Sequence, residues 1–217
     1  MIALVAGGTG LVGQALVANL LGDAQVSGVH ALARTVPAAA GEGGPSWHDW
    51  DWLDAADAPA VDAAFCCLGT THREAGSREA FAAVDRDLTL RFAERARGMG
   101  ASRFGLVSSV GAAPGARSHY LRVKGEVEQA LDALGFEALH IMRPSLLLGV
   151  RGQTRPAEDL AQKLAPALGP ALRGPLARYR PVPAQRVAEQ LACSVLHGPV
   201  GRHVHYPWLP DTPSHRS

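Results

Sequence analysis

"LVAGGTGLVG", residues 4–13, is an apolar run that breaks into glycines and then becomes apolar again. Four glycines within seven positions weaken both helix and strand, so this backbone must turn tightly or be approached closely. The stretch fits G-x-G-x-x-G, follows a strand-like run at 2–6 and precedes apolar residues at helical spacing over 11–21. This context predicts the first strand–turn–helix unit of a parallel sheet.

Strand-like and helical segments then alternate along the chain. The strands are expected at 26–33, 61–68, 103–108 and 137–142, and the helices at 78–99, 119–134, 157–168 and 184–196. This alternation predicts an α/β fold, a Rossmann-type doubly wound parallel sheet with helices on both faces. No internal repeat and no linker divides the 217 residues, so we expect one domain, 1–217.

Composition and charge narrow the class of protein. The chain is 47% hydrophobic and 19% charged with a net charge of +1, which is typical of a globular domain. This balance gives no reason to expect a nucleic acid or an anionic membrane as partner. Three cysteines make no disulfide framework and suit a reducing cytosol, so a cytoplasmic location is expected. The sequence shows neither a signal peptide nor a membrane-spanning run.

The glycine motif predicts where a dinucleotide would bind. Gly7 and Gly10 would let the backbone approach a pyrophosphate, and Gly13 would let the helix pack closely on the sheet. Free N–H groups at the start of the helix, near Leu11 and Val12, would face the anion. The alternative is a glycine-rich turn that binds no ligand.

The end of the second strand indicates which dinucleotide. An NAD site usually places an acid there on the ribose 2′-hydroxyl, but this chain has "HALART", with Arg34 at that place. A guanidinium matches a 2′-phosphate, so NADP(H) is the expected cofactor. Asp51 falls where a later loop would meet the adenine. The alternative for Arg34 is a solvated surface residue.

A second motif predicts the reacting end. In "LVSSVGAAPGARSHYLRVKGE", residues 106–126, a strand ends in two serines and a helix then carries Tyr120 and Lys124. Their four-residue spacing puts both side chains on one helical face. A tyrosine can protonate the alkoxide formed when a carbonyl accepts hydride, and a neighbouring ammonium stabilises the phenolate that remains. Ser109 would hold the carbonyl oxygen, with Ser108 as the other candidate. The alternative is an ordinary amphipathic helix.

Six segments together resemble the short-chain dehydrogenase/reductase superfamily in its atypical, NmrA-like branch, and most closely the Tat-interactive oxidoreductase-like family. They are "AGGTGLVG", "FCCLGTTHREAGS", "VDRDLTL", "FGLVSSVGA", "YLRVKGEVE" and "MRPSLLLG". The resemblance implies a Rossmann fold, bound NADPH and a catalytic set of Ser109, Tyr120 and Lys124. It also implies that Leu68 and Gly69 line the cofactor cleft and that the chain from Arg143 to Leu146 passes near the nicotinamide. Family members often carry paired basic residues after the second strand, whereas Thr35 follows Arg34 here.

Two functions fit these residues. The first is an NADPH-dependent reductase of a small-molecule carbonyl, with Tyr120 as proton donor and residues of about 145–210 forming a lid over the substrate. The second is a sensor that binds NADP(H) without turnover, which would not need Tyr120. A homodimer through the helices at 78–99 and 119–134 is expected by analogy with such folds. No metal site is expected, because His203 and His205 lack an evident third ligand.

Overall fold

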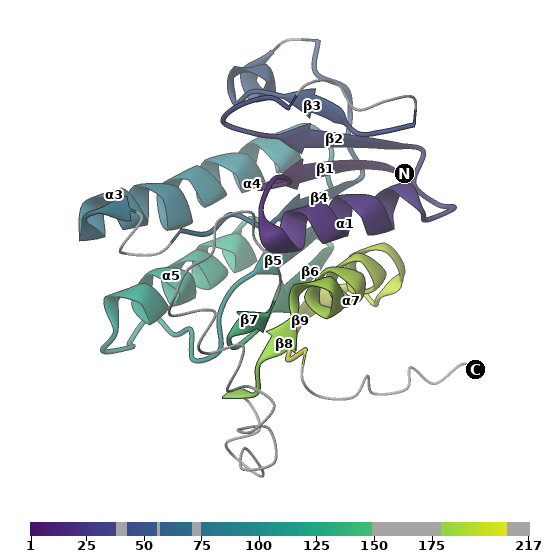
Figure 1. Cartoon of the computed structure of the whole chain (residues 1–217). Helices are drawn as coiled ribbons and strands as arrows, with labels where there is room; N and C mark the ends of the chain where they lie inside the picture. The colour runs from purple at the N-terminus through teal and green to yellow at the C-terminus, as the bar shows by residue number, and fades with distance from the viewer. Residues whose placement is uncertain (38–42, 56, 71–74, 149–178, 208–217) are drawn as a thin grey trace.

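A seven-stranded parallel sheet forms the centre of the molecule (Figure 1). The computed structural model describes residues 1–37, 43–55, 57–70, 75–148 and 179–207. The strand order is β3-β2-β1-β4-β5-β6-β9, and all six neighbouring pairs are parallel. The strands are β1 (Ile2–Ala6), β2 (Gly28–Leu32), β3 (Ser46–His48), β4 (Ala63–Cys66), β5 (Arg103–Val107), β6 (Ala138–Met142) and β9 (Gly201–His205). The predicted Rossmann-type fold is confirmed.

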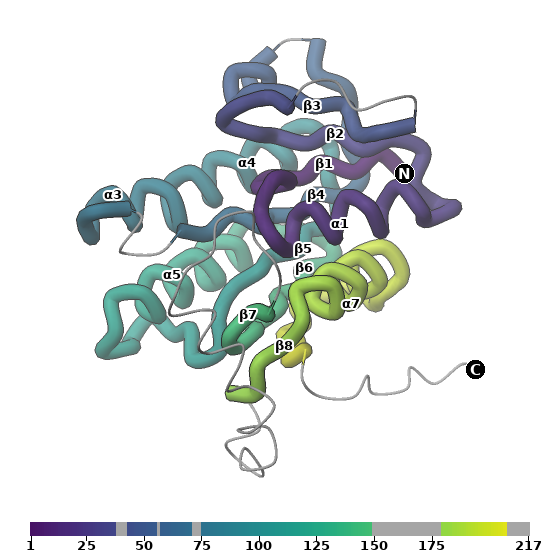
Figure 2. The backbone as a smooth tube through the Cα atoms, in the orientation of Figure 1, coloured from purple at the N-terminus to yellow at the C-terminus, as the bar shows by residue number. Residues whose placement is uncertain are grey.

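Helices cover both faces of the sheet. Helices α1 (Leu11–Leu21) and α7 (Ala184–His197) lie side by side on one face, and α4 (Thr89–Gly98) and α5 (His119–Ala133) cover the other (Figures 1 and 2). Strand β1 shows why both faces are covered. Its side chains alternate between two buried clusters, one on each face of the sheet. Ala3 and Val5 pack with α1 and α7, whereas Leu4 packs with α4 and α5. A strand buried on both faces needs the continuous apolar run seen in the sequence.

The helix expected at 78–99 consists of three parts. It begins as α3 (Arg78–Ala82), widens into a π-helical segment, η2 (Ala83–Leu88), and continues as α4. The hydroxyl of Ser77 caps the start by accepting a hydrogen bond from the N–H of Ala80 at 3.0 Å. A π-helical turn inside a longer helix is often found at functional sites.

The strand order places the glycine turn at the centre of the sheet. β1 is followed along the chain by β2 on one side, and β4 then pairs with β1 on the other side. The order of strands therefore reverses at β1, and ligands of open α/β sheets bind beyond the carboxyl ends of the strands at such a point. The glycine turn, the serine pair and the start of α5 all follow the carboxyl ends of strands in this sheet.

Some elements differ from those expected. β3 lies outside the strands expected from the sequence, and a separate two-stranded sheet joins β7 (Leu147–Leu148) to β8 (Val182–Pro183). The helix expected at 157–168 lies outside the described residues, as do residues 149–178 and 208–210 of the expected lid at about 145–210. Among the described helices, none has the length and apolar character needed to cross a bilayer.

Three histidines form a cluster where β6 pairs with the edge strand β9. His140 is fully buried, and its Nδ1 lies 2.9 Å from Nε2 of His205, while its ring stacks on that of His203 with centroids 5.1 Å apart. Burial, together with the neighbouring His205, His203 and Arg103, lowers the pKa of His140 to about 4. A buried histidine of this kind favours the neutral form.

The histidine cluster predicts a loss of stability in mild acid. The unfolded chain takes up a proton on His140 near pH 6.5, whereas the folded chain resists protonation down to about pH 4. Stability contributed by neutral His140 is therefore complete above pH 6.5 and is lost as the pH falls toward 4. We expect a loss of about 2 kcal/mol in the free energy of unfolding between pH 7 and pH 5 from this residue. Urea unfolding at the two pH values measures it.

The control for this effect is His140→Leu, which removes the titrating group and keeps an apolar side chain at the site. The variant should lose about 2 kcal/mol less than the original protein between the same pH values. Equal losses in both proteins would show that other groups cause the acid sensitivity.

Candidate active site

The glycine turn is shaped by close packing of backbone on backbone. Gly7 has φ +79, and a Cβ there would lie 2.7 Å from the carbonyl carbon and oxygen of Cys67, which follows β4. A Cβ on Gly13 would overlap the carbonyl oxygen of Gly7. Gly7 and Gly13 are therefore required by the protein's own packing, since no L side chain fits either place.

The N-terminus of α1 has the features of an anion site. Gly10 is its N-cap, and with no side chain it leaves the helix uncapped. The first hydrogen bond of the helix runs from the N–H of Gln14 to the carbonyl of Gly10, so the N–H groups of Leu11, Val12 and Gly13 precede it. No acidic residue stands in the first turn. Unfilled donors and the positive end of the helix dipole fit the pyrophosphate of a dinucleotide.

Arg34 and Asp51 lie on the β2–β3 side of the glycine turn. The N–H of Ala33 donates to the carbonyl of His48 at 3.0 Å, so the chain leaves β2 beside the end of β3. Arg34 is exposed immediately after this bond. Asp51 is exposed at the start of η1 (Asp51–Asp54), a 3-10 turn. The contact of Arg34 with a 2′-phosphate and that of Asp51 with an adenine stay predictions.

Lys124 lies in a buried ion pair. Its Nζ is 2.6 Å from Oδ1 of Asp85 in η2, and their side chains are 5% and 0% exposed. Asp85 also accepts a hydrogen bond from the N–H of Thr70 at 2.9 Å. Burial lowers the pKa of Lys124, but the Asp85 carboxylate and Tyr120 raise it, and the net shift is upward. Lys124 is therefore held as a cation inside the protein.

Tyr120 stands four residues before Lys124, on the first turn of α5, and is half-buried. Its ring packs against Phe81 of α3, with centroids 5.5 Å apart. Tyr120 contributes to the upward shift in the pKa of Lys124. The structure places both residues on α5, one turn apart and on the same helical face.

Leu68 and Gly69 connect the glycine turn to Lys124. The nitrogen of Leu68 would lie 3.0 Å from a Cβ on Gly7, so this backbone borders the turn. A Cβ on Gly69 would lie 3.9 Å from both Nζ of Lys124 and Oδ1 of Asp85. The segment after β4 thus runs between the predicted pyrophosphate site and the predicted catalytic lysine.

The two serines after β5 have different surroundings. Ser108 is 5% exposed, and its hydroxyl donates to Oε1 of Glu128 at 2.5 Å. Ser109 is half-buried, and its hydroxyl makes a long bond of 3.4 Å to the carbonyl of Val110. Ser108 is therefore engaged by a carboxylate, while Ser109 makes only a weak local bond.

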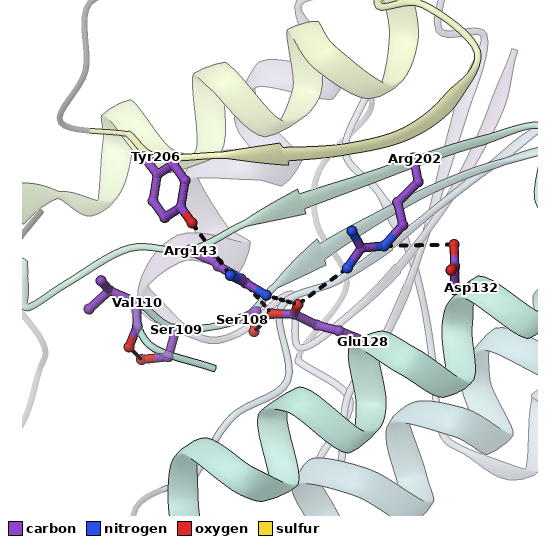
Figure 3. Close-up of polar contacts among 8 residues, drawn as sticks. All are labelled: Ser108, Ser109, Val110, Glu128, Asp132, Arg143, Arg202 and Tyr206. Carbon is purple, nitrogen blue, oxygen red and sulfur yellow. Dashed lines mark hydrogen bonds and ion pairs between the residues drawn. The ribbon is translucent and has the colours of Figure 1, made fainter. Parts of the chain in front are cut away.

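Arg143 follows β6 and binds a carboxylate of the protein itself (Figure 3). Its Nε and Nη2 donate to the two oxygens of Glu128 at 3.0 and 2.5 Å, and its Nη1 lies 3.4 Å from the hydroxyl of Tyr206. The expected place of Arg143 near the nicotinamide stays a prediction. Its guanidinium has a structural partner that the sequence did not indicate.

Asp85 and Glu128 were not identified from the sequence. Asp85 lies on the same helical stripe as the buried residues Phe81 and Phe92, and Glu128 stands four residues after Lys124. An acid on a buried helical stripe signals a partner of opposite charge, because a lone buried carboxylate is unfavourable. The sequence therefore indicates that Asp85 and Glu128 need cationic partners, but it does not indicate which residues these are.

In the described parts of the chain, the cysteine and histidine side chains form neither a thiolate site nor a metal site. Burial raises the pKa of both Cys66 and Cys67, so these thiols resist ionisation. Among the residues with described positions, no three His, Cys, Asp or Glu side chains are arranged to bind a metal. His203 and His205 pack with His140 instead.

Comparisons with known proteins place the chain in a family. The profile of the NAD dependent epimerase/dehydratase family matches residues 3–168. Protein fmp52 of Emericella nidulans is 35% identical over 177 residues, which cover 77% of this chain and 76% of that protein. Protein HTATIP2 of Rattus norvegicus is 48% identical over 102 residues, but the match covers 47% of this chain and 42% of that protein.

Solved structures share the fold at low sequence identity. The structure titled "MoeE5 in complex with UDP-glucose and NAD" matches with a TM-score of 0.69 and 18% identity, over 94% of this chain and 75% of that chain. This likeness supports the doubly wound sheet and leaves the substrate open.

The expected cytoplasmic location is wrong by this comparison. Protein fmp52 of Emericella nidulans and its relatives in three Aspergillus species are named as mitochondrial. The expectation rested on free cysteines, and these do not distinguish one reducing compartment from another.

The family follows from the profile match, from the fmp52 and HTATIP2 relatives and from the shared sheet. The chain belongs to the NAD-dependent epimerase/dehydratase family, in its atypical short-chain dehydrogenase/reductase branch related to HTATIP2 and fmp52.

Proposed function

We propose that this protein is an NADPH-dependent reductase that converts a small-molecule carbonyl to an alcohol. The observation that carries the proposal is Tyr120, half-buried one helical turn before a lysine whose charge is buried and paired with Asp85. A buried ammonium beside a phenol supports proton donation by that phenol, since it stabilises the phenolate left behind. The uncapped N-terminus of α1 supplies the neighbouring anion site.

The residues present fit a dinucleotide. The glycine turn leads to helix N–H donors that no side chain caps, and Gly7, Leu68 and Gly69 lie between this turn and Lys124. When bound, the reduced nicotinamide supplies the hydride. In the titles of two structural neighbours, NAD is part of the complex, which supports a nicotinamide cofactor for this fold.

Each catalytic residue has one role in the proposal. Ser109 donates a hydrogen bond to the carbonyl oxygen of the substrate and orients it. Tyr120 gives its hydroxyl proton to that oxygen as the carbon accepts hydride, and it recovers a proton from solvent. Lys124 stabilises the phenolate and binds the nicotinamide ribose. The products are the alcohol and the oxidised cofactor.

Arg34 is proposed to select NADPH over NADH. A charge-assisted contact to the 2′-phosphate contributes roughly 1.5–3 kcal/mol, which is roughly ten- to a hundredfold in affinity. Arg34→Ala should therefore weaken NADPH binding by at least about tenfold and leave NADH binding unchanged. Titration followed by tryptophan fluorescence measures both dissociation constants.

The matched control is Arg97→Ala, an exposed arginine in the last turn of α4, far along the chain from the second strand. It removes the same charge and should leave both dissociation constants unchanged. The reductase function is tested by the same titration and then by a screen of aldehydes and ketones for NADPH oxidation. If the original protein bound neither NADPH nor NADH, the reductase proposal would be rejected. If the original protein bound NADH more tightly than NADPH, the proposed role of Arg34 would be rejected.

A further inference from the structure

Helix α5 carries a third polar residue, Glu128, in register with the proposed catalytic pair. Tyr120, Lys124 and Glu128 are spaced four apart, so they follow one another along one face of the helix. Glu128 is 2% exposed, although nothing in the proposed reaction uses it. A carboxylate so deeply buried needs an explanation, because it is stable there only with strong partners.

The partners of Glu128 come from three strands (Figure 3). Ser108, directly after β5, donates to Oε1 at 2.5 Å. Arg143, directly after β6, donates to both oxygens, and Nη2 of Arg202 in β9 lies 3.6 Å from Oε2. Arg202 also reaches Asp132, one turn further along α5, at 3.7 Å. One carboxylate therefore joins the ends of β5 and β6 to the helix that carries Tyr120.

The backbone around this carboxylate leads to Ser109. The N–H of Ser108 donates to the carbonyl of Met142 at 2.8 Å, and the N–H of Val110 donates to that of Pro144 at 2.9 Å. Ser109 lies between these two bonds, and its own hydroxyl makes only the 3.4 Å bond to Val110. The place of Ser109 is thus set by its neighbours, through these two backbone bonds and through the Ser108 side chain fixed on Glu128.

The hydroxyl of Ser108 has one proton, and that proton is engaged by Glu128. It cannot donate to a substrate oxygen at the same time. The two serines therefore have separate tasks, one of anchoring the turn and one of contacting the substrate.

We propose that Glu128 is a positioning residue, which fixes the turn after β5 through Ser108 and Arg143 and so holds Ser109 where the substrate carbonyl oxygen lies. This inference rests on the proposed reductase function. Small displacements of an orienting group lower turnover strongly, by about a hundredfold for 1 Å, so a rigid anchor beneath Ser109 has a direct effect on rate.

The test compares three variants in NADPH oxidation with a carbonyl substrate. Ser109→Ala removes the proposed donor and should lower kcat by about a hundredfold or more. Ser108→Ala keeps the pair of Glu128 with Arg143 and should lower kcat about tenfold, with the dissociation constant of NADPH unchanged. Glu128→Gln should act in the same direction. The control Glu126→Gln changes a half-exposed carboxylate on the same helix, which contacts Arg86 and Arg122, and should leave kcat unchanged.

A double variant separates positioning from general weakening of the fold. If Ser108 acts through Ser109, then Ser108→Ala should have no further effect on kcat in a Ser109→Ala background. Independent, multiplying effects would overturn the proposal.

A second readout needs no substrate and no turnover. Amide hydrogen exchange of residues 107–113 should be faster in Ser108→Ala and Glu128→Gln than in the original protein, and unchanged in Glu126→Gln. Unchanged exchange in the first two variants would overturn the anchoring role even if no carbonyl substrate is reduced. Absence of NADPH binding or turnover in the original protein would instead reject the proposed function.

Discussion

Tyr120→Phe should lower kcat for carbonyl reduction by about a thousandfold, within the range found when a general acid is removed. The variant loses the hydroxyl that protonates the substrate oxygen and keeps the ring that packs on Phe81. The buried pair of Lys124 with Asp85 is untouched, so the fold and the dissociation constant of NADPH should be unchanged. Steady-state kinetics and a fluorescence titration on the same preparation measure both quantities.

The control is Glu126→Gln, which changes a half-exposed carboxylate on the same helix. This variant should keep full turnover. Full turnover by Tyr120→Phe would show that another group donates the proton. If the original protein binds NADPH tightly but does not oxidise it in the presence of any carbonyl tested, the sensor hypothesis is favoured over the reductase.

The fold could be predicted because buried parallel strands are apolar along their whole length. β1 and β4 are almost entirely apolar, so their positions are evident from composition alone. β3 is the three residues Ser46–His48, and β7 is only two residues long, so neither carries a pattern that composition reveals. Such strands form because a neighbour offers hydrogen bonds, and that neighbour is distant in the sequence.

The site could be predicted only where its chemistry depends on local spacing. The glycine turn and the pair of Tyr120 with Lys124 are each contained in a few consecutive residues. The partners that make Lys124 and Glu128 stable come from other elements, Asp85 from η2 and Arg143 from the end of β6. Nothing in the sequence pairs these residues, because the pairing arises from the order of strands and from the π-helical turn.

Sequence analysis explains only in part why the residues of the glycine turn must lack side chains. A pyrophosphate was expected to approach the backbone at Gly7, but a Cβ there would already meet the protein's own backbone at Cys67. Gly13 was expected to allow close packing of the helix, and a Cβ there would overlap the carbonyl oxygen of Gly7. Gly10 differs from them, because a Cβ there would meet only the Gly7 carbonyl oxygen, at 3.2 Å. Its role as an N-cap without a side chain is what leaves the helix donors open to an anion.

Gly13→Ala should lower the free energy of unfolding by about 3 kcal/mol, although alanine is the better helix former by about 1 kcal/mol. The new Cβ would overlap the carbonyl oxygen of Gly7, which is backbone and cannot move aside as a flexible side chain would. Displacing that carbonyl shifts the turn and the first N–H groups of α1, so NADPH binding should weaken by about tenfold or more. Urea unfolding and fluorescence titration measure the two effects.

Gly98→Ala is the matched control, since Gly98 is the last residue of α4 and a Cβ there meets nothing within 4 Å. The same substitution in open space should leave the stability unchanged or raise it slightly, because alanine lowers the entropy of the unfolded chain. The difference between the two variants isolates the contact between Gly13 and Gly7 from the general preference of helices for alanine. A Gly13→Ala protein as stable as Gly98→Ala, with NADPH affinity retained, would show that α1 can move away from the turn. The tight glycine packing would then not be what holds the helix donors at the predicted pyrophosphate site.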